Sequence, residues 1–516
     1  MVRPGAVERF GPWKMRAVSA SLARLHQLLV AVPAAAAQYR GDVEVGRLVM
    51  NSLEVRPGDL YAAVPGGSTD GHAHAAAAVR RGAVAVLVQR WLPLDVPQLR
   101  VNRVRAVLGT VAAELAGRPA DQLRLVAVTG TNGKTTTSLL LHAALLSAGG
   151  RPAVIGTLGS RLGELHRDSA LTTPEAPELH ALLRWIADDG GHDVVLEASS
   201  IALEQGRLDG LRMALAVHTG LEEEHLDFHG TVEQYWASKA ALFIPDRCEE
   251  ALVRIDDPWG VRLARQVRVP VTTYGSAPSA DVRLERVRTG LAGTSVQLSG
   301  RDGRVELDVP LLGRVNGVNA TAAYLAARRL GLSREQARDG LAKAAAPPGR
   351  HSLVIADDAP LVVVDFAHTP GALAALLETG RELAASGGRV LLVFGGRGER
   401  DRAKRADLAR VAARADLLVL TCDTTEREGV EAVLAEYRLG LLGSVVPLVV
   451  EQDRRAAIDT ALRRGRAGDV VLVAGRGAEP LLRVHGSAQR FVDREVVEEL
   501  LGLTANMAEP HLPAVP

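Results

Sequence analysis

The segment from Val126 to Thr137 has the residue types and the spacing of a phosphate-binding loop. An apolar run is followed by Thr129-Gly130-Thr131-Asn132-Gly133-Lys134-Thr135-Thr136 and then by the apolar start of a helix. Glycines let successive backbone N–H groups turn toward phosphate oxygens, and the dipole of the following helix favours the same anion. We expect Lys134 to reach the β- and γ-phosphates of a nucleotide and the Thr135 hydroxyl to bind Mg²⁺. Val128 stands where the strict spacing has glycine, whereas the Gly-Lys-Thr centre is intact.

Lysine is scarce in this chain, which uses arginine for almost all of its cationic side chains. Only Lys14, Lys134, Lys239, Lys343 and Lys404 interrupt this preference among 61 Lys plus Arg residues. A retained lysine is therefore a candidate for a position that needs a compact ammonium or a reactive amine, with chance retention as the alternative.

The overall charge and the cysteines exclude several classes of protein. Lys plus Arg total 61 and Asp plus Glu total 60, so no global field attracts nucleic acid or an anionic membrane. Cys248 and Cys422 form neither a metal-ligand spacing nor a disulfide framework, which indicates a reducing, cytoplasmic setting. The best membrane candidate, Leu25 to Ala37, is interrupted by Pro33 and is too short to span a bilayer.

The apolar runs predict an α/β protein with several domains, because 516 residues exceed the roughly 250 that one core supports. From Leu123 onward, strand-like runs alternate with helical stretches, which is typical of a parallel sheet covered by helices. Between Val282 and Val309 the period changes to two, and Arg301-Asp302-Gly303 is a hairpin signal, so we expect a small antiparallel appendage there. The predicted strands are Leu123–Thr129, Pro152–Thr157, Asp193–Glu197, Ala214–Thr219, Leu361–Asp365, Val390–Phe394, Leu417–Thr421 and Val470–Val473.

Together with the phosphate loop, several further segments resemble the Mur ligases, which build the peptide stem of peptidoglycan, and most closely the UDP-N-acetylmuramoyl-tripeptide synthetases. These segments occur in one order along residues 45 to 500. They are Ser52 with Arg56-Pro57-Gly58-Asp59-Leu60, Leu171-Thr172-Thr173-Pro174-Glu175, Leu196-Glu197-Ala198-Ser199-Ser200, His225-Leu226-Asp227-Phe228-His229-Gly230 followed by Lys239, Leu312-Gly313-Arg314 with Asn316 and Asn319, Pro348-Gly349-Arg350, and Asp365-Phe366-Ala367-His368-Thr369-Pro370.

The resemblance implies three domains and an ATP-dependent amide ligase. A central P-loop ATPase domain with a parallel sheet and the antiparallel appendage is expected at 118–346. A domain for the UDP or carboxylate substrate is expected at 21–117, and a Rossmann-like amino-acid-binding domain at 347–504. We expect a flexible extension at 1–20 and a tail at 505–516. The reaction implied is the addition of an amino acid to a carboxylate, UDP-N-acetylmuramoyl-dipeptide in the resembled enzymes, through an acyl phosphate with release of ADP and phosphate.

The resemblance assigns nucleotide, metal and catalytic roles residue by residue. Lys134, Glu197, His225 and Lys239 are the expected catalytic residues, and Thr135, Glu197, His225 and Lys239 the expected supports of Mg²⁺. In the resembled family the lysine matching Lys239 is carbamylated by CO₂, although a solvated helical lysine is the plainer alternative. The expected ATP-binding residues are Gly130, Thr131, Asn132, Gly133, Lys134, Thr135, Thr136, Asn316, Asn319, Arg350, Asp365 and His368.

The remaining matched positions concern the two substrates. Arg207 is the strongest candidate, because an anionic glycopeptide needs a fixed cation. The expected substrate-binding residues are Ser52, Thr172, Thr173, Ser199, Gln205, Arg207, Arg400, Asp423, Glu426 and Glu479. ATP, an amino acid and a UDP-muramoyl-peptide or related carboxylate are the expected partners of a protein that we expect to be monomeric.

The amino-acid pocket departs from the family pattern. Asp423-Thr424-Thr425-Glu426 stands where the family commonly has Asp-Asn-Pro-Arg, whose arginine binds the distal carboxylate of meso-diaminopimelate. Glu426 would repel that carboxylate, which predicts discrimination against meso-diaminopimelate unless Arg427 takes the role. Gly475-Arg476-Gly477-Ala478-Glu479 likewise keeps the acid of Gly-Lys-Gly-His-Glu and loses its histidine.

These departures leave other functions open. One alternative is a divergent Mur-like ligase that acts on a non-peptidoglycan carboxylate in specialised metabolism, and another is a non-catalytic nucleotide-binding paralogue. Lys134, Glu197 and Lys239 argue against the second. A Rossmann dehydrogenase is disfavoured, because Phe394-Gly395-Gly396-Arg397-Gly398 lacks the required glycine spacing.

Overall fold

The computed structural model describes residues 19–32, 35–66, 69–163, 165–301, 303–399, 402–425, 428–484 and 486–503. The chain forms two compact units. The first comprises Met1–Leu221, Glu233–Arg283 and Ala322–Leu341, and the second comprises Glu222–Val232, Leu284–Thr321 and Ala342–Pro516. The predicted tail and nearly all of the predicted extension lie outside the described residues. The domain boundaries at 117/118 and 346/347 stay predictions.

The N-terminal part of the first unit is a small sheet in the order β2-β7-β6-β5-β4, with β2 antiparallel and the rest parallel. Leu60, Tyr61 and Ala62 are all buried, as expected for a parallel strand that is covered on both faces. One face packs against α1 and α3 and the other against α2. The elements are β1 Ala20–Ser21, α1 Leu22–Val30, β2 Gln38–Arg40, β3 Glu44–Val45, β4 Arg47–Val49, β5 Asp59–Ala62, α2 Ala75–Arg80, β6 Ala85–Val88, β7 Gln98–Arg100 and α3 Arg105–Leu115.

The central sheet is mixed, in the order β11-β10-β9-β12-β8-β13-β14-β15-β16-β17-β18. The predicted strands at Leu123, Pro152, Asp193 and Ala214 are confirmed as parallel neighbours within it. The elements are β8 Arg124–Thr129, α4 Lys134–Ser147, β9 Ala153–Gly156, β10 Gly159–Leu162, β11 Leu165–Arg167, α5 Ala176–Asp188, β12 Asp193–Glu197, α6 Ser200–Glu204, β13 Met213–His218, α7 Leu226–His229, α8 Val232–Ala240, β14 Cys248–Arg254, α9 Pro258–Gln266, β15 Val271–Gly275, β16 Val282–Gly290, β17 Gly293–Gly300, β18 Gly303–Val309, α10 Arg314–Arg329 and α11 Arg334–Ala342.

The predicted antiparallel hairpin is confirmed, with one difference in its place in the fold. β17 and β18 pair antiparallel, with Gly300 opposite Gly303, while Asp302 lies outside the described residues. Instead of forming a separate sheet, this segment extends the central sheet, because β16 pairs in parallel with β15 at Tyr274 and Gly275. An alternating pattern alone cannot reveal that edge pairing, which depends on backbone groups.

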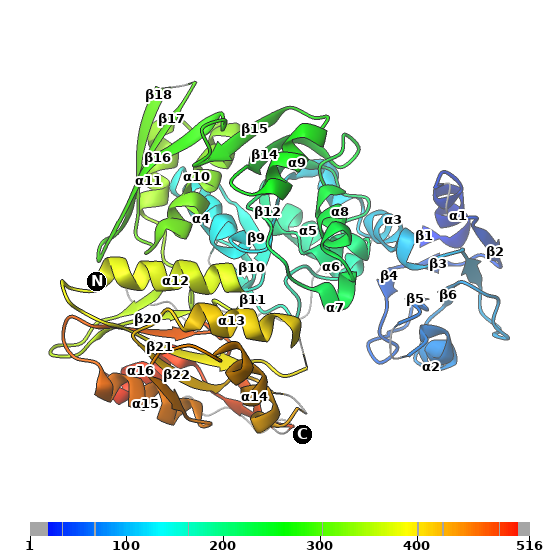
Figure 1. Ribbon diagram of the computed structural model, residues 1–516. Coiled ribbons are helices and arrows are strands. Elements are labelled where there is room, and N and C mark those ends of the chain that lie inside the picture. Colours follow the sequence, from blue (N-terminus) through cyan, green and yellow to red (C-terminus); the bar gives the residue numbers. More distant parts are fainter. Residues whose placement is uncertain are drawn as a thin grey trace. The chain divides into compact units, whose positions relative to one another are not determined.

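The C-terminal sheet lies in the second unit, and its strands β20, β21 and β22 are labelled in Figure 1. The strand order is β19-β20-β24-β21-β22-β23. Its strands are parallel except β19, and their burial confirms the predicted runs. Helices α12, α13 and α14 cover one face, and α15 and α16 the other. The elements are β19 Ser352–Val354, β20 Leu361–Asp365, α12 Pro370–Leu383, β21 Val390–Gly396, α13 Arg405–Ala412, β22 Leu417–Cys422, α14 Val430–Gly440, β23 Leu448–Val450, α15 Arg454–Arg464, β24 Val470–Ala474, β25 Leu481–Val484, β26 Ser487–Arg490 and α16 Asp493–Leu500.

Parallel strands that are neighbours end at the same edge of a sheet, and loops at this edge bind ligands in open α/β folds. In the second unit the loops that follow β20, β24, β21 and β22 therefore share one edge. Among the described helices, none combines the length and the apolar character needed to cross a membrane.

A buried ion pair ties α15 to α16 beside this sheet. Arg454 Nε and Nη2 each donate to an Asp493 carboxylate oxygen at 2.7 Å, and Nη2 also donates to the Ala474 carbonyl at 3.0 Å. Both side chains are at most 1% exposed. Removing one member of such a pair leaves the other charge buried and uncompensated.

We predict that Arg454→Ala destabilises the second unit by about 3–5 kcal/mol, because Asp493 loses its two hydrogen bonds to Arg454 and keeps the more distant Arg476, at 3.9 Å. The measurement is the free energy of opening from hydrogen exchange in peptides that cover β24 and α16. Arg455→Ala on the same helix is the matched control, since the Arg455–Glu499 pair is exposed and should matter little. Equal effects of the two substitutions would contradict the structural role of the buried pair.

Candidate active site

The phosphate loop has the predicted strand, loop and helix context. β8 ends at Thr129 and α4 begins at Lys134, with Gly133 at φ +87° immediately before the helix. Gly130 has φ +147°, and a Cβ there would lie 2.0 Å from Thr219 Oγ1, so only glycine fits. Lys134 Nζ donates to the carbonyl oxygens of Gly130 and Thr131, each at 2.9 Å. This places the ammonium over the loop, where phosphate oxygens would lie.

Glu197 brings a buried carboxylate to the same loop. It ends β12, next to β8, and is 2% exposed. Thr135 Oγ1 donates to Glu197 Oε2 at 2.9 Å, and Thr157 donates to the carboxylate from Oγ1 and from N, both at 3.0 Å. The carboxylate has room only because residue 156 is glycine, since a Cβ at Gly156 would lie 2.0 Å from Glu197 Oε1.

The cluster of Glu197, Thr135 and Thr157 fits a magnesium ion. Its groups are hard oxygen donors, and Mg²⁺ usually takes one or two protein ligands together with waters and phosphate oxygens. No set of three or more His, Cys, Asp or Glu side chains is placed to hold a metal among the described residues.

Lys239 is not the solvated helical lysine of the plainer alternative. Its side chain is 2% exposed, and Nζ donates to the Gly130 carbonyl at 2.9 Å. Nζ also lies 4.6 Å from the centre of the Tyr235 ring, and the Tyr235 hydroxyl lies 3.0 Å from Thr131 Oγ1. Helix α8 therefore presents Lys239 to the phosphate loop.

The predicted carboxylate-substrate residues of the first unit form one hydrogen-bonded group. Thr173 Oγ1 donates to the Glu197 carbonyl at 2.7 Å, and Thr172 Oγ1 lies 3.0 Å from Thr157 Oγ1. Ser199 N donates to Thr173 Oγ1 at 3.1 Å.

Arg207 belongs to this group as its cation. It donates from Nη1 to the Thr173 carbonyl at 2.8 Å and from Nη2 to Gln205 Oε1 at 2.7 Å, and it pairs with Glu175 at 3.1 Å. Burial lowers the pKa of Arg207, an effect that the Glu175 charge opposes. Ser52, by contrast, lies in the half-buried turn after β4.

The predicted nucleotide residues outside the loop lie in the second unit. Asn316 and Asn319 are buried on α10, and Asn319 Nδ2 donates to Asn316 Oδ1 at 3.1 Å. The Arg350 guanidinium lies 4.5 Å from the centre of the Phe366 ring. Burial favours a raised pKa for Asp365, but the charges of His351 and Arg350 and a hydrogen bond from His351 hold that pKa below its ordinary value.

Segment Glu222–Val232, which carries the predicted metal ligand His225, also belongs to the second unit. The structure thus divides the predicted metal set, with Thr135, Glu197 and Lys239 in the first unit. Glu224 is buried, and its Oε1 lies 2.9 Å from His368 Nε2 and 3.8 Å from Lys404 Nζ. Burial opposes ionisation, yet the hydrogen bond and charge of His368 hold the pKa of Glu224 well below its usual range.

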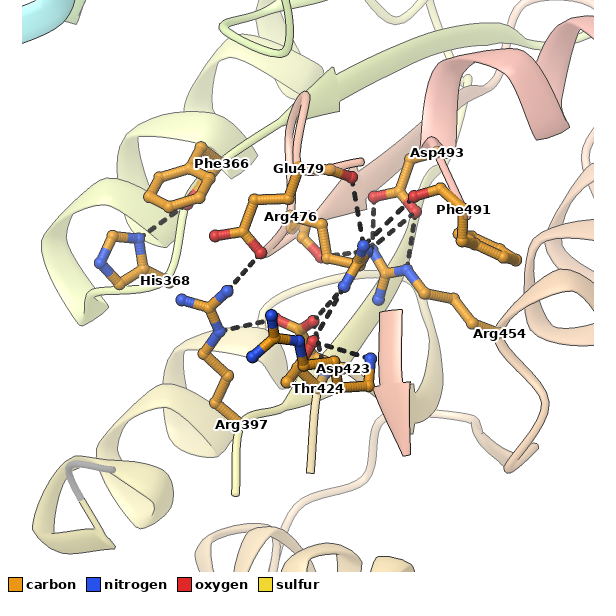
Figure 2. Close-up of polar contacts among 12 residues, drawn as sticks. Phe366, His368, Arg397, Asp423, Thr424, Arg454, Arg476, Glu479, Phe491 and Asp493 are labelled. Carbon is orange, nitrogen blue, oxygen red and sulfur yellow. Dashed lines mark hydrogen bonds and ion pairs between the residues drawn. The ribbon is translucent and has the colours of Figure 1, made fainter. Parts of the chain in front are cut away.

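The predicted amino-acid pocket contains an ion-pair network that Figure 2 shows. Arg397, directly after β21, pairs with Glu479 and places Nε 3.4 Å from Asp423 Oδ2. Arg476 Nη1 donates to Asp423 Oδ1 at 2.8 Å. Burial would raise the pKa of Asp423, but the charges of Arg397, Arg454 and Arg476 lower it. Arg400, Glu426 and Arg427 lie outside the described residues.

Three side chains at these sites were not predicted from the sequence. Thr157 binds Glu197, Arg397 links two predicted pocket residues, and Glu428 receives two hydrogen bonds from the fully buried Arg405, at 3.0 and 2.8 Å. A charged residue directly after a buried strand was the available signal for Arg397. No sequence signal marks Thr157, since its partner is distant in the chain.

Segments of both units match models of known protein families. Residues 128–327 match the family model of the Mur ligase middle domain, and residues 349–477 match that of the Mur ligase glutamate ligase domain. The chain is 38% identical to UDP-N-acetylmuramoyl-L-alanyl-D-glutamate--2,6-diaminopimelate ligase of Geobacter metallireducens, covering 88% of this chain and 94% of that protein. The protein of the same name from Gloeobacter violaceus is 39% identical, covering 93% and 98%.

A solved structure of a protein with this name shares 31% identity and a TM-score of 0.64. The match covers 89% of this chain and 95% of that one.

We predict that Gly156→Ala reduces the Mg²⁺-dependent part of nucleotide affinity by about 10-fold or more, because the new methyl group displaces the Glu197 carboxylate. Calorimetric titration of the nucleotide with and without Mg²⁺ measures that part. Gly290→Ala is the matched control, because a Cβ there meets nothing within 4 Å. An unchanged Mg²⁺ dependence in Gly156→Ala would show that the Glu197 position does not matter for the metal.

Proposed function

The chain belongs to the Mur ligase family, and on that premise we propose that it joins diaminopimelate to UDP-N-acetylmuramoyl-L-alanyl-D-glutamate. Family membership makes it an ATP-dependent acid–amino-acid ligase. The observation that supports the two substrates is the match over nearly the whole chain to relatives named for this reaction. The cluster of Lys134, Thr135, Glu197 and Lys239 favours a working enzyme over a non-catalytic paralogue.

The reaction needs a leaving group on the substrate carboxyl carbon. A carboxylate oxygen attacks the γ-phosphorus of ATP, ADP leaves, and an acyl phosphate forms. The amine of the amino acid then attacks the acyl carbon, the amine loses a proton and phosphate leaves. Lys134 is the cation at the transferring phosphate, and Arg207 is the fixed cation for the anionic glycopeptide. Asn316, Asn319, Arg350, Asp365 and His368 remain proposed nucleotide-binding residues.

Thr135 and Glu197 would hold Mg²⁺, and His225 is proposed to support it. When bound, the ion supplies positive charge that neutralises the phosphate oxygens during transfer. Thr157 keeps the Glu197 carboxylate in place through two hydrogen bonds. Lys134 Nζ now donates to the carbonyls of Gly130 and Thr131. When the nucleotide and the metal bind, phosphate oxygens would replace these carbonyls as its partners.

Lys239 is proposed to carry a carbamate. Its amine is buried beside the phosphate loop and donates to the same Gly130 carbonyl as Lys134, so a permanent ammonium would place two like charges close together. Burial penalises the charged form of an amine. The neutral amine can add CO₂ and lose a proton, which converts a cation into an anion suited to a metal site.

The proposed amino acid, diaminopimelate, is the one that Glu426 was expected to disfavour. That argument treats one loop position alone, and both Glu426 and Arg427 lie outside the described residues. The named relatives point instead to diaminopimelate. The pocket also contains a described cation, Arg397, next to Asp423 and Glu479.

The remaining sequence-based expectations belong to this proposal as well. They are a cytoplasmic monomer, a UDP-substrate domain at 21–117 that includes Ser52, an ATP-binding domain at 118–346 and an amino-acid-binding domain at 347–504. Cys248 and Cys422 are buried free thiols, in agreement with a reducing compartment.

We predict that the amino-acid-dependent release of phosphate is fastest with meso-diaminopimelate when UDP-N-acetylmuramoyl-dipeptide is the acceptor. The measurement compares kcat/KM for meso-diaminopimelate, lysine, ornithine and small neutral amino acids, with Lys134→Ala as the inactive reference. A preference for lysine or ornithine would overturn the proposed amino acid. Phosphate release that requires a different carboxylate would overturn the proposed acceptor.

We predict that Lys239→Ala lowers kcat by about 10³-fold or more and that small carboxylates added in solution restore part of the activity, because they replace the lost carbamate anion. Lys343→Ala, at an exposed lysine, is the control and should behave as the wild type. ¹³C-bicarbonate should give a carbamate NMR signal in the wild type that is absent from Lys239→Ala. A wild type without this signal at saturating bicarbonate would refute the carbamate.

A further inference from the structure

Three loops at the carboxyl edge of the C-terminal sheet converge on one charged cluster (Figure 2). Arg397 follows β21, Asp423 follows β22 and Glu479 follows β24. Arg397 bridges the two carboxylates, through Nη2 to Glu479 and through Nε, 3.4 Å from Asp423. The cluster also contains Arg476, Arg454 and Asp493, so its three cations balance three anions.

The deep half of this cluster is buried. Arg476 is fully buried, pairs with Asp423 at 2.8 Å and donates to the carbonyls of Glu479 and Phe491, each at 3.2 Å. Asp423 also accepts the Thr424 N–H at 2.6 Å and is 2% exposed. Asp423 Oδ1 is therefore already bound by Arg476 and by the Thr424 N–H.

The outer half remains accessible. The side chains of Arg397 and Glu479 are 27% and 29% exposed, and they pair with each other. A guanidinium and a carboxylate side by side are complementary to an ammonium and a carboxylate on one carbon atom. Such a group can bind its ammonium to Glu479 and its carboxylate to Arg397, so that no charge is left without a partner.

The backbone of Arg397 is held in place. Arg405 Nη2 donates to the Arg397 carbonyl at 2.8 Å, and Gly398 N donates to the Thr424 carbonyl at 3.0 Å. Arg405 is itself fixed by Glu428 and Glu436. The backbone of this arginine is therefore fixed, while its side chain remains 27% exposed.

We propose that Arg397, beside the expected substrate-binding residue Glu479, determines amino-acid specificity by binding the distal carboxylate of the incoming amino acid. This inference rests on the proposed function, in which that amino acid is diaminopimelate. Arg397 then supplies, from the loop after β21, the cation that position 426 lacks.

Lysine is the direct probe, because it is diaminopimelate without the distal carboxylate. The experiment measures kcat/KM for both amino acids in the wild type, Arg397→Gln, Arg397→Lys and Arg455→Ala. Where an amino acid is not turned over, its Ki against the preferred one is measured instead. The cycle of two enzymes and two substrates isolates the coupling between Arg397 and the distal carboxylate.

We expect Arg397→Gln to lower the diaminopimelate-to-lysine ratio by about 10- to 100-fold, mainly through KM for diaminopimelate. Arg397→Lys should recover part of the ratio, since it keeps the charge but loses the two-pronged guanidinium geometry. Arg455→Ala, at an exposed ion pair, should leave the ratio unchanged.

An equal loss for both amino acids, or no change for either, would overturn the role of Arg397. A wild type that prefers lysine would instead overturn the proposed amino acid, and the response of the ratio to Arg397→Gln would still decide the role of Arg397.

Discussion

The buried carboxylate of Glu197 is the constraint on which the nucleotide side of this ligase depends. A charge that is 2% exposed is tolerable only with hydrogen-bond donors around it, and here they are the hydroxyls of Thr135 and Thr157 and the Thr157 N–H. The pairing of β12 with β8 sets the carboxylate beside the phosphate loop, and Gly156 leaves the space it occupies. The position of the Glu197 carboxylate beside the phosphate loop thus depends on the strand order, on Gly156 and on the hydroxyl of Thr135.

In the second unit, arginine side chains donate hydrogen bonds to the buried carboxylates of Asp423 and Asp493. Its parallel strands end at one edge, where Arg397, Arg454 and Arg476 meet Asp423, Glu479 and Asp493. The Arg454–Asp493 pair between α15 and α16 has almost no exposure, whereas Arg397 and Glu479 keep part of their surface. The buried ion pairs of this network therefore stabilise the loops. The partly exposed pair of Arg397 and Glu479 is available to bind a charged substrate.

The sequence predicted the parts of this structure that local patterns encode. The apolar runs identified the strands of both large sheets, and the glycine spacing identified the loop between β8 and α4. It did not predict that β16 joins the central sheet, because edge pairing is made by backbone groups. Thr157 and Arg397 were missed because their partners, Glu197 and Glu479, are 40 and 82 residues away in the chain. The scarcity of lysine singled out Lys239, but only the structure shows its amine at the Gly130 carbonyl.

The central claim is that this chain activates its substrate carboxylate as an acyl phosphate. The most direct measurement uses UDP-N-acetylmuramoyl-dipeptide labelled with ¹⁸O in the reacting carboxylate and analyses the released phosphate by mass spectrometry. Because the carboxylate oxygen that attacks the γ-phosphorus leaves with it, we predict one ¹⁸O atom in each phosphate released during ligation. Unlabelled phosphate, formed at the rate of amide-bond formation, would contradict the acyl phosphate and the mechanism built on it.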